Sequence, residues 1–150
     1  YCRIARRSQS LSETDKSRLN QLLHFLETEI KEFAQHRQLK YVVYQQDKVT
    51  RRNVERWTET LVMALIDTAK IVLASEQREI PETYHAGVRA CALRLHFSEP
   101  DAEQLAGYAR LRNILSHQYM DLRFTRIKEF LESAEPLYRR LIDAVNGLVR

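Results

Sequence analysis

Apolar stripes with the period of an α-helix constrain the fold of this chain more than any other feature. The clearest runs from Lys48 to Ser75, where apolar residues recur every three or four positions over about five turns. The chain of 150 residues has only three glycines and three prolines, so few positions interrupt such helices. No alternating pattern of useful length indicates a β-strand. The sequence therefore predicts an all-α bundle of about five helices.

The other helices are expected from the same period and from terminal signals. A first helix is predicted from about Ser12 to Gln35, with Ser10 and Glu13 as a capping box. Residues 36–46 break the pattern and are expected to pack locally through Tyr41, Val42, Val43 and Tyr44. Three more helices are expected: one opening at Pro81, one from Ser98 to about Tyr119 or Leu122, and one from about Thr125 that Pro136 kinks or divides.

Charge and composition narrow the class of protein. The net charge is +4, from 24 Lys and Arg against 20 Asp and Glu, which permits an acidic partner such as RNA without requiring one. No apolar run approaches the ~20 residues that span a bilayer. Cys2 and Cys91 form neither a disulfide framework nor a metal-ligand pattern. We expect one soluble, cytoplasmic domain over residues 1–150, with a flexible basic segment at 1–11 and no cofactor.

The segment that carries chemistry, Arg112 to Tyr119, lies in the fourth predicted helix. A helical wheel places Arg112 and Tyr119 about two turns apart on nearly the same line. It also predicts an arc without Lys, Asp or Glu, in which small residues surround polar ones; the arc holds Ala102, Ala106, Ala109, Arg112, Asn113, Ser116, His117 and Met120. Because small side chains allow close approach of a ligand or another backbone, we expect a lined groove.

This segment resembles the HepT-like branch of the HEPN superfamily (higher eukaryotes and prokaryotes nucleotide-binding). That branch has the motif Arg-Asn-x-x-x-His-x-Tyr, which is matched here by Arg112, Asn113, His117 and Tyr119. Ser116 departs from the pattern, since an apolar residue is expected before the histidine. The similarity covers about residues 12–135 in the expected order. Outside the motif it is carried by two stretches, Arg51–Arg56 and Ile80–Tyr84, and by the single residue Asp67.

The resemblance implies a HEPN-like helical fold and a toxin ribonuclease of a toxin–antitoxin pair. It also implies a partner, a minimal nucleotidyltransferase antitoxin that adenylylates Tyr119. Added negative charge and bulk there are expected to repel RNA and to block the site.

The motif side chains suit RNA cleavage without a metal ion. RNA carries its own nucleophile, the 2′-hydroxyl, so the enzyme needs a base, an acid and a cation for the crowded phosphorane. His117 titrates in the range for a base or an acid, Arg112 offers a permanent planar charge, and Asn113 can orient either group. One histidine cannot be both acid and base in the same step. We therefore predict a homodimer whose two-fold axis, on the small-residue face, brings two copies of the motif into one cleft.

Plainer interpretations stay open for each motif residue. Arg112 can form a structural ion pair, His117 can lie at an interface, Asn113 can bind backbone, and Tyr119 can simply pack. The alternative function is a non-catalytic HEPN-type module that binds nucleotide or RNA, or docks the antitoxin. Such a module has no need for His117, and the motif therefore favours an endoribonuclease.

Two other features of the sequence concern a possible metal site and the role of Asp67. Glu82 and His85 have the spacing of a carboxylate di-iron bundle, but no second copy of this pair exists, so no metal site is expected. Asp67, on the second helix, either reaches the cleft or only satisfies polarity in the core, and the sequence does not choose between the two.

Overall fold

The computed structural model describes residues 11–117 and 119–150. Within these ranges the chain is helical and has no strand, which confirms the all-α prediction. The elements follow in this order: α1 (Glu13–Glu29), the 3-10 turn η1 (Ile30–Glu32), α2 (Phe33–His36), α3 (Tyr41–Gln46), α4 (Lys48–Ser75), α5 (Tyr84–Arg94), α6 (Glu99–Tyr108), α7 (Leu111–His117) and α8 (Met120–Val149). The predicted helices correspond to α1, α4, α5, α6 and α8.

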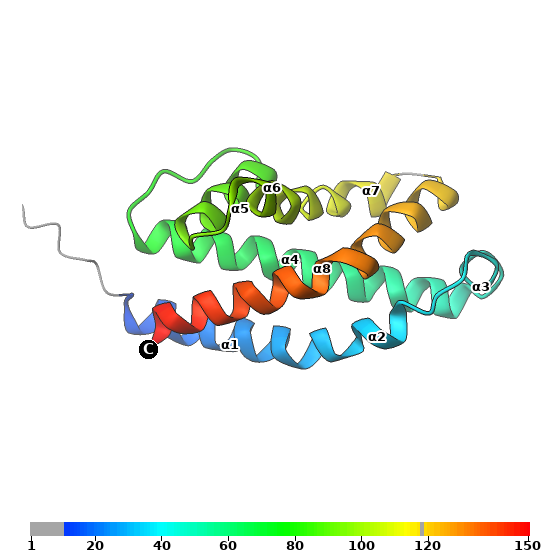
Figure 1. Ribbon diagram of the computed structural model, residues 1–150, viewed down its shortest axis with the longest axis horizontal. Coiled ribbons are helices and arrows are strands. Elements are labelled where there is room, and N and C mark those ends of the chain that lie inside the picture. Colours follow the sequence, from blue (N-terminus) through cyan, green and yellow to red (C-terminus); the bar gives the residue numbers. More distant parts are fainter. Residues whose placement is uncertain (1–10, 118) are drawn as a thin grey trace, which may run out of the picture.

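Three long helices, α1, α4 and α8, run along the length of the molecule (Figure 1). α5 and α6 pack on each other, and they contact α4 and α8 respectively. α7 contacts both α4 and α8, nearer the end of the bundle where α3 lies (Figure 1). α7 is therefore carried at one end of the frame formed by α4 and α8.

The first helical run begins at a capping residue different from the one predicted. The Ser12 hydroxyl accepts a hydrogen bond from the backbone N–H of Asp15 at 3.1 Å, so Ser12 is the N-cap. Ser10 lies outside the described residues. The run continues to His36, close to the predicted end, but it passes through a 3-10 turn at Ile30–Glu32.

The segment after α2 contains the short helix α3. Tyr44 is fully buried, and the ring of Tyr41 lies 5.1 Å from the ring of Phe124. Local packing is therefore confirmed for both tyrosines. Val42 and Val43 are 51% and 41% exposed, so the same prediction is wrong for these two valines.

The beginnings of α5 and α8 also differ from the sequence expectation. The Thr83 hydroxyl accepts from the backbone N–H of Ala86 at 3.1 Å, so α5 starts after Thr83 while Pro81 lies in the preceding loop. α8 starts at Met120 rather than near Thr125. It continues through Pro136 and is not divided there, although this proline has no N–H to donate within the helix.

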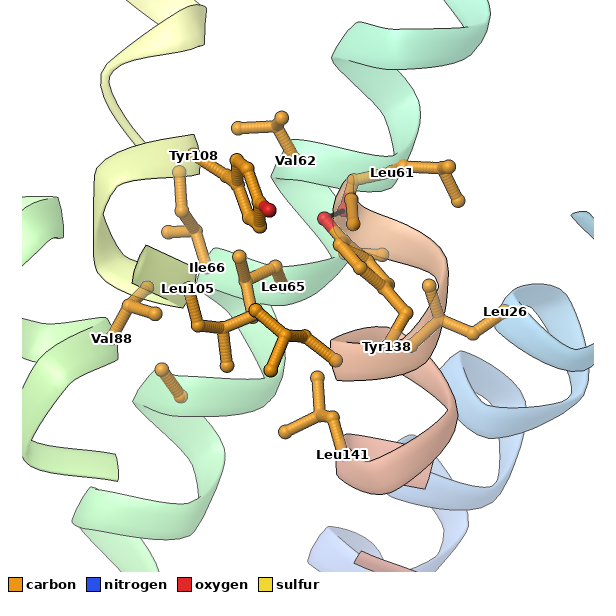
Figure 2. Packing of buried hydrophobic residues seen from close by; sticks show 14 of the residues in the cluster. Leu26, Leu61, Val62, Leu65, Ile66, Val88, Leu105, Tyr108, Tyr138 and Leu141 are labelled. Carbon is orange, nitrogen blue, oxygen red and sulfur yellow. Dashed lines mark hydrogen bonds between the residues drawn. The ribbon is translucent and has the colours of Figure 1, made fainter. Parts of the chain in front are cut away.

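Aromatic rings fill the core where α8 crosses the other helices. The Phe130 ring centre lies 5.5 Å from that of Phe33, 5.2 Å from that of Tyr108 and 5.8 Å from that of Tyr138, with edge-to-face geometry in the last two pairs. The buried Tyr138 hydroxyl donates to the Leu61 carbonyl oxygen of α4 at 2.9 Å (Figure 2). Burial raises the pKa of this phenol well above its usual value, which keeps the hydroxyl protonated as a donor.

Among residues 11–117 and 119–150, no helix is long and apolar enough to cross a membrane.

Candidate active site

The motif lies on a short helix of its own. After α6 ends, the N–H groups of Ala109 and Arg110 donate to carbonyl oxygens three residues back, at 3.1 and 3.2 Å, and the chain turns before α7 begins. α7 then ends at His117. The predicted continuous helix to Tyr119 or Leu122 is therefore wrong, because the tight turns interrupt it between α6 and α7.

This break changes the role of the small residues. Ala102, Ala106 and Ala109 are 0%, 0% and 3% exposed, and α6 packs on α5. These alanines belong to the core of the protomer and do not line a groove with the polar motif residues. The predicted arc is therefore wrong, and a two-fold axis cannot lie on a face that the chain itself already covers.

Arg112, in the first turn of α7, contacts the first turn of α5. Its Nη1 donates to the Tyr84 hydroxyl at 2.5 Å, and its Cζ lies 4.9 Å from the centre of the Tyr84 ring. The Nζ of Lys70, on α4, lies 5.0 Å from the same ring centre. A tyrosine face attracts both cations, by ~0.5–1 kcal/mol each when they are exposed. Both cations thus contact the same ring.

The contacts of Arg112 test the alternative that this residue forms a structural ion pair. Among the described residues, no carboxylate lies within 4.0 Å of the Arg112 guanidinium or the Lys70 ammonium. An ion pair within the part of the chain described here therefore does not explain Arg112. Its guanidinium is held in place by the hydroxyl of Tyr84.

The next residues of α7 face solvent. Asn113 and Ser116 are both exposed. The Ser116 hydroxyl donates to the Arg112 carbonyl oxygen at 3.1 Å. The departure from the family pattern at Ser116 therefore falls on the surface. Asn113 lies one turn before His117 on the backbone of α7; the side chain of His117, and Gln118, lie outside what the structure describes.

Tyr119 lies between α7 and α8 in an extended conformation, with φ −62° and ψ 152°. It is therefore not on a helical line with Arg112, as the wheel predicted. Its side chain is 84% exposed, so Tyr119 does not pack against the described part of its own chain.

A comparison with models of protein families shows to which family the chain belongs. The family model described as "Ribonuclease HepT-like" matches residues 26–145, which include the whole motif. The chain belongs to the HepT-like ribonuclease family. This confirms the resemblance seen in the sequence. The chain matches no curated protein at a significant level.

Sequence reasoning missed two residues that contact the motif or its partner, Tyr84 and Lys70. Tyr84 precedes Arg112 by 28 positions, and only the packing of α4, α5 and α7 brings the three side chains together. One signal was available, since Tyr84 ends a stretch that resembles the family. Nothing in the local pattern singled out Lys70.

Asp67 forms no ion pair with Arg112 or Lys70. It lines a groove between α1 and α4 together with Leu22, Phe25 and Met63, and no residue lining that groove comes from α7. Within the described chain, Asp67 therefore lies in a different groove from the motif.

His85 is bound to a carboxylate of another helix. Its Nε2 lies 2.8 Å from a Glu103 oxygen, and Arg89 lies 3.2 Å from the other oxygen of the same group. Over residues 11–117 and 119–150, no group of three or more His, Cys, Asp or Glu side chains is placed to hold a metal ion.

Proposed function

We propose that this HepT-like chain is a metal-independent endoribonuclease. The observation that carries the proposal is the Arg112 guanidinium, held by the Tyr84 hydroxyl and accompanied by Lys70, in a member of a ribonuclease family. An arginine next to an exposed helical face is suited to a phosphate of RNA. The residues on that face are Asn113 and Ser116.

The proposed reaction is attack of a 2′-hydroxyl on the adjacent phosphorus. The O2′–P bond forms, the P–O5′ bond breaks, and the products end in a 2′,3′-cyclic phosphate and a 5′-hydroxyl. His117 takes the proton from the 2′-hydroxyl or gives one to the leaving oxygen. Arg112 stabilises the negative charge of the phosphorane, and Asn113 orients the histidine or the phosphate.

The proposed active form is a homodimer with a shared cleft. One histidine per chain cannot serve as base and acid in the same step, whereas a two-fold axis near α7 supplies a second His117 and a second Arg112. The exposure of Asn113, Ser116 and Tyr119 supports this arrangement, because the surface around the motif is uncovered in the isolated chain.

The proposed biological role is the toxin of a toxin–antitoxin pair with a minimal nucleotidyltransferase as antitoxin. The partner transfers an adenylyl group to Tyr119: the phenol oxygen bonds to the α-phosphorus of ATP, pyrophosphate leaves, and the phenol proton is released. The 84% exposure of Tyr119 supports this proposal. The added phosphate carries negative charge beside the motif and repels the RNA backbone.

The nuclease is tested by cleavage of RNA by purified protein in EDTA, with the product ends identified. We expect wild type to leave 2′,3′-cyclic phosphates, and we expect His117→Ala to cut about 10²–10⁴-fold more slowly with its fold unchanged. Retained cleavage in His117→Ala would contradict the catalytic role. If nothing cuts while RNA binding persists in His117→Ala, the chain is the non-catalytic binding module.

Neutralisation is tested with Tyr119→Phe, which removes only the phenol oxygen that accepts the adenylyl group. We expect the variant to cleave RNA like wild type and to stay active after incubation with the antitoxin and ATP. The measurement is RNA cleavage before and after incubation, with the mass of each chain determined in parallel. The matched control is Tyr41→Phe, a second partly exposed tyrosine, which should be neutralised normally. Equal neutralisation of Tyr119→Phe and wild type would show that control lies elsewhere.

A further inference from the structure

A pocket of about 230 Å³ lies between α4, α5 and residues 80–83, and its lining includes Tyr84, the residue that binds Arg112. Its walls include the buried side chains of Ile66, Leu73 and Val88, and Tyr84 also lines it. We call this space the Tyr84 pocket. The ring that holds Arg112 thus forms part of a largely apolar hollow, which Lys70 lines directly and Arg112 reaches through its contact with Tyr84.

Gly87 shows that this hollow is open space next to the core. The residue is buried and lines the pocket, yet a Cβ built on it meets no atom within 4 Å. Protein interiors are close-packed, so an unfilled space beside a buried backbone is uncommon. The space is large enough for side-chain or ligand atoms to enter without displacing the protein.

The size and chemistry of the Tyr84 pocket restrict its occupant. Its volume is below the roughly 300–1,000 Å³ of sites for drug-sized ligands, so it fits one ring system better than a whole nucleotide. Its apolar walls and the Tyr84 ring suit a flat aromatic group, which gains affinity by stacking. The charged residues of the lining are Lys70, whose Nζ lies 5.0 Å from the Tyr84 ring centre, and Glu82, which is exposed.

We propose that the Tyr84 pocket holds one nucleobase of the RNA, next to the phosphate bound by Arg112 and Lys70. In RNA a sugar joins each base to a neighbouring phosphate, so a base site and a phosphate site must adjoin, as the pocket and the cations do. This inference rests on the proposed ribonuclease function. The pocket makes Tyr84 a binding residue as well as the residue that positions Arg112.

The test fills the pocket with Gly87→Leu. Since the Cβ position is open, the added side chain enters the hollow, and leucine favours the helix over glycine by ~1 kcal/mol. The matched control is Gly147→Leu, near the end of α8, where a Cβ likewise meets no atom within 4 Å. Thermal unfolding establishes that each variant is folded. Gly87→Ala, which adds only the Cβ, serves if the larger side chain prevents folding.

The first readout is binding of a short 2′-O-methyl RNA, which cannot be cleaved because the nucleophile is blocked. We expect wild type and Gly147→Leu to lose about tenfold in affinity when one particular base is removed to leave an abasic position. Gly87→Leu should bind the intact RNA about tenfold more weakly and should lose nothing further with the abasic RNA. Identical behaviour of Gly87→Leu and Gly147→Leu would overturn the inference.

The second readout separates this inference from the function on which it rests. Cleavage of an unmodified RNA of the same sequence should show a higher KM for Gly87→Leu and a kcat close to that of wild type. If the proteins bind RNA with the base dependence described but none of them cuts, the pocket assignment stands and the nuclease is wrong. If wild type cuts and the filled pocket changes neither KM nor binding, the nuclease stands and the pocket assignment is wrong. Failure of wild type to bind or to cut RNA would overturn both.

Discussion

Arg112→Ala is expected to slow RNA cleavage about 10²–10³-fold while the protein stays folded. Removing one preorganised group that stabilises transition-state charge typically has an effect of this size. Arg112 is only partly buried, and its contacts with Tyr84 are worth about 1–2 kcal/mol, so the bundle should survive the change. The measurement is single-turnover cleavage of a short RNA in EDTA, with thermal unfolding recorded for each protein.

The control for this prediction is Arg112→Lys, which keeps the charge but loses the planar fork. We expect a rate between those of wild type and Arg112→Ala, because a lysine still attracts phosphate but does not donate two parallel hydrogen bonds. Cleavage by Arg112→Ala at the wild-type rate would show that Arg112 is structural.

Arg112→Ala also tests whether the active cleft is shared between two protomers. When wild type and Arg112→Ala are folded together in equal amounts, a cleft that needs both arginines leaves about a quarter of the wild-type specific activity, because only dimers of two wild-type chains are intact. Independent protomers would leave about a half. The second outcome would exclude a cleft that requires Arg112 from both chains.

Phe130→Ala is expected to lower the free energy of unfolding by about 3–5 kcal/mol, the usual effect of truncating a buried aromatic residue. Phe130 is fully buried, and its ring lies against Phe33, Tyr108 and Tyr138. The variant leaves a cavity among these rings and removes their edge-to-face contacts. Urea unfolding followed by circular dichroism measures the change.

Tyr138→Phe is the matched control at the neighbouring ring. It keeps the ring and removes only the hydroxyl that donates to Leu61, so we expect a loss of about 1 kcal/mol (Figure 2). A loss below about 1 kcal/mol for Phe130→Ala would mean that the core closes over the missing ring, contrary to the close packing seen here.

The helices could be predicted because a helix that buries one face carries apolar residues on that face, every three or four positions along the sequence. The stripe from Lys48 to Ser75 predicts α4 at its observed bounds, since each apolar residue on it is stabilised by leaving water. Helix ends depend instead on single hydrogen bonds, for which several nearby side chains compete. Ser12 and Thr83 provide those bonds at two ends, where the sequence favoured Ser10 and Pro81.

The candidate site could be predicted in its residue types but not in its arrangement. The motif gave Arg112, Asn113, His117 and Tyr119, whereas the wheel assumed that the helix continues through the turn between α6 and α7. Apolar residues keep helical spacing across that turn, so periodicity does not reveal it. The Tyr84 contact with Arg112 depends on how α5 packs beside α7, and tertiary contacts of this kind leave no local pattern in the sequence.

The position of α8 has a consequence for how the chain is made. α8 follows the motif along the sequence and contacts α1, α3, α6 and α7, so the core is incomplete until α8 is present (Figure 1). During translation Arg112 leaves the ribosome before α8 does, and the helices made first still expose their apolar faces. The proposed nuclease is therefore not yet assembled while the segment before α8 is being synthesised.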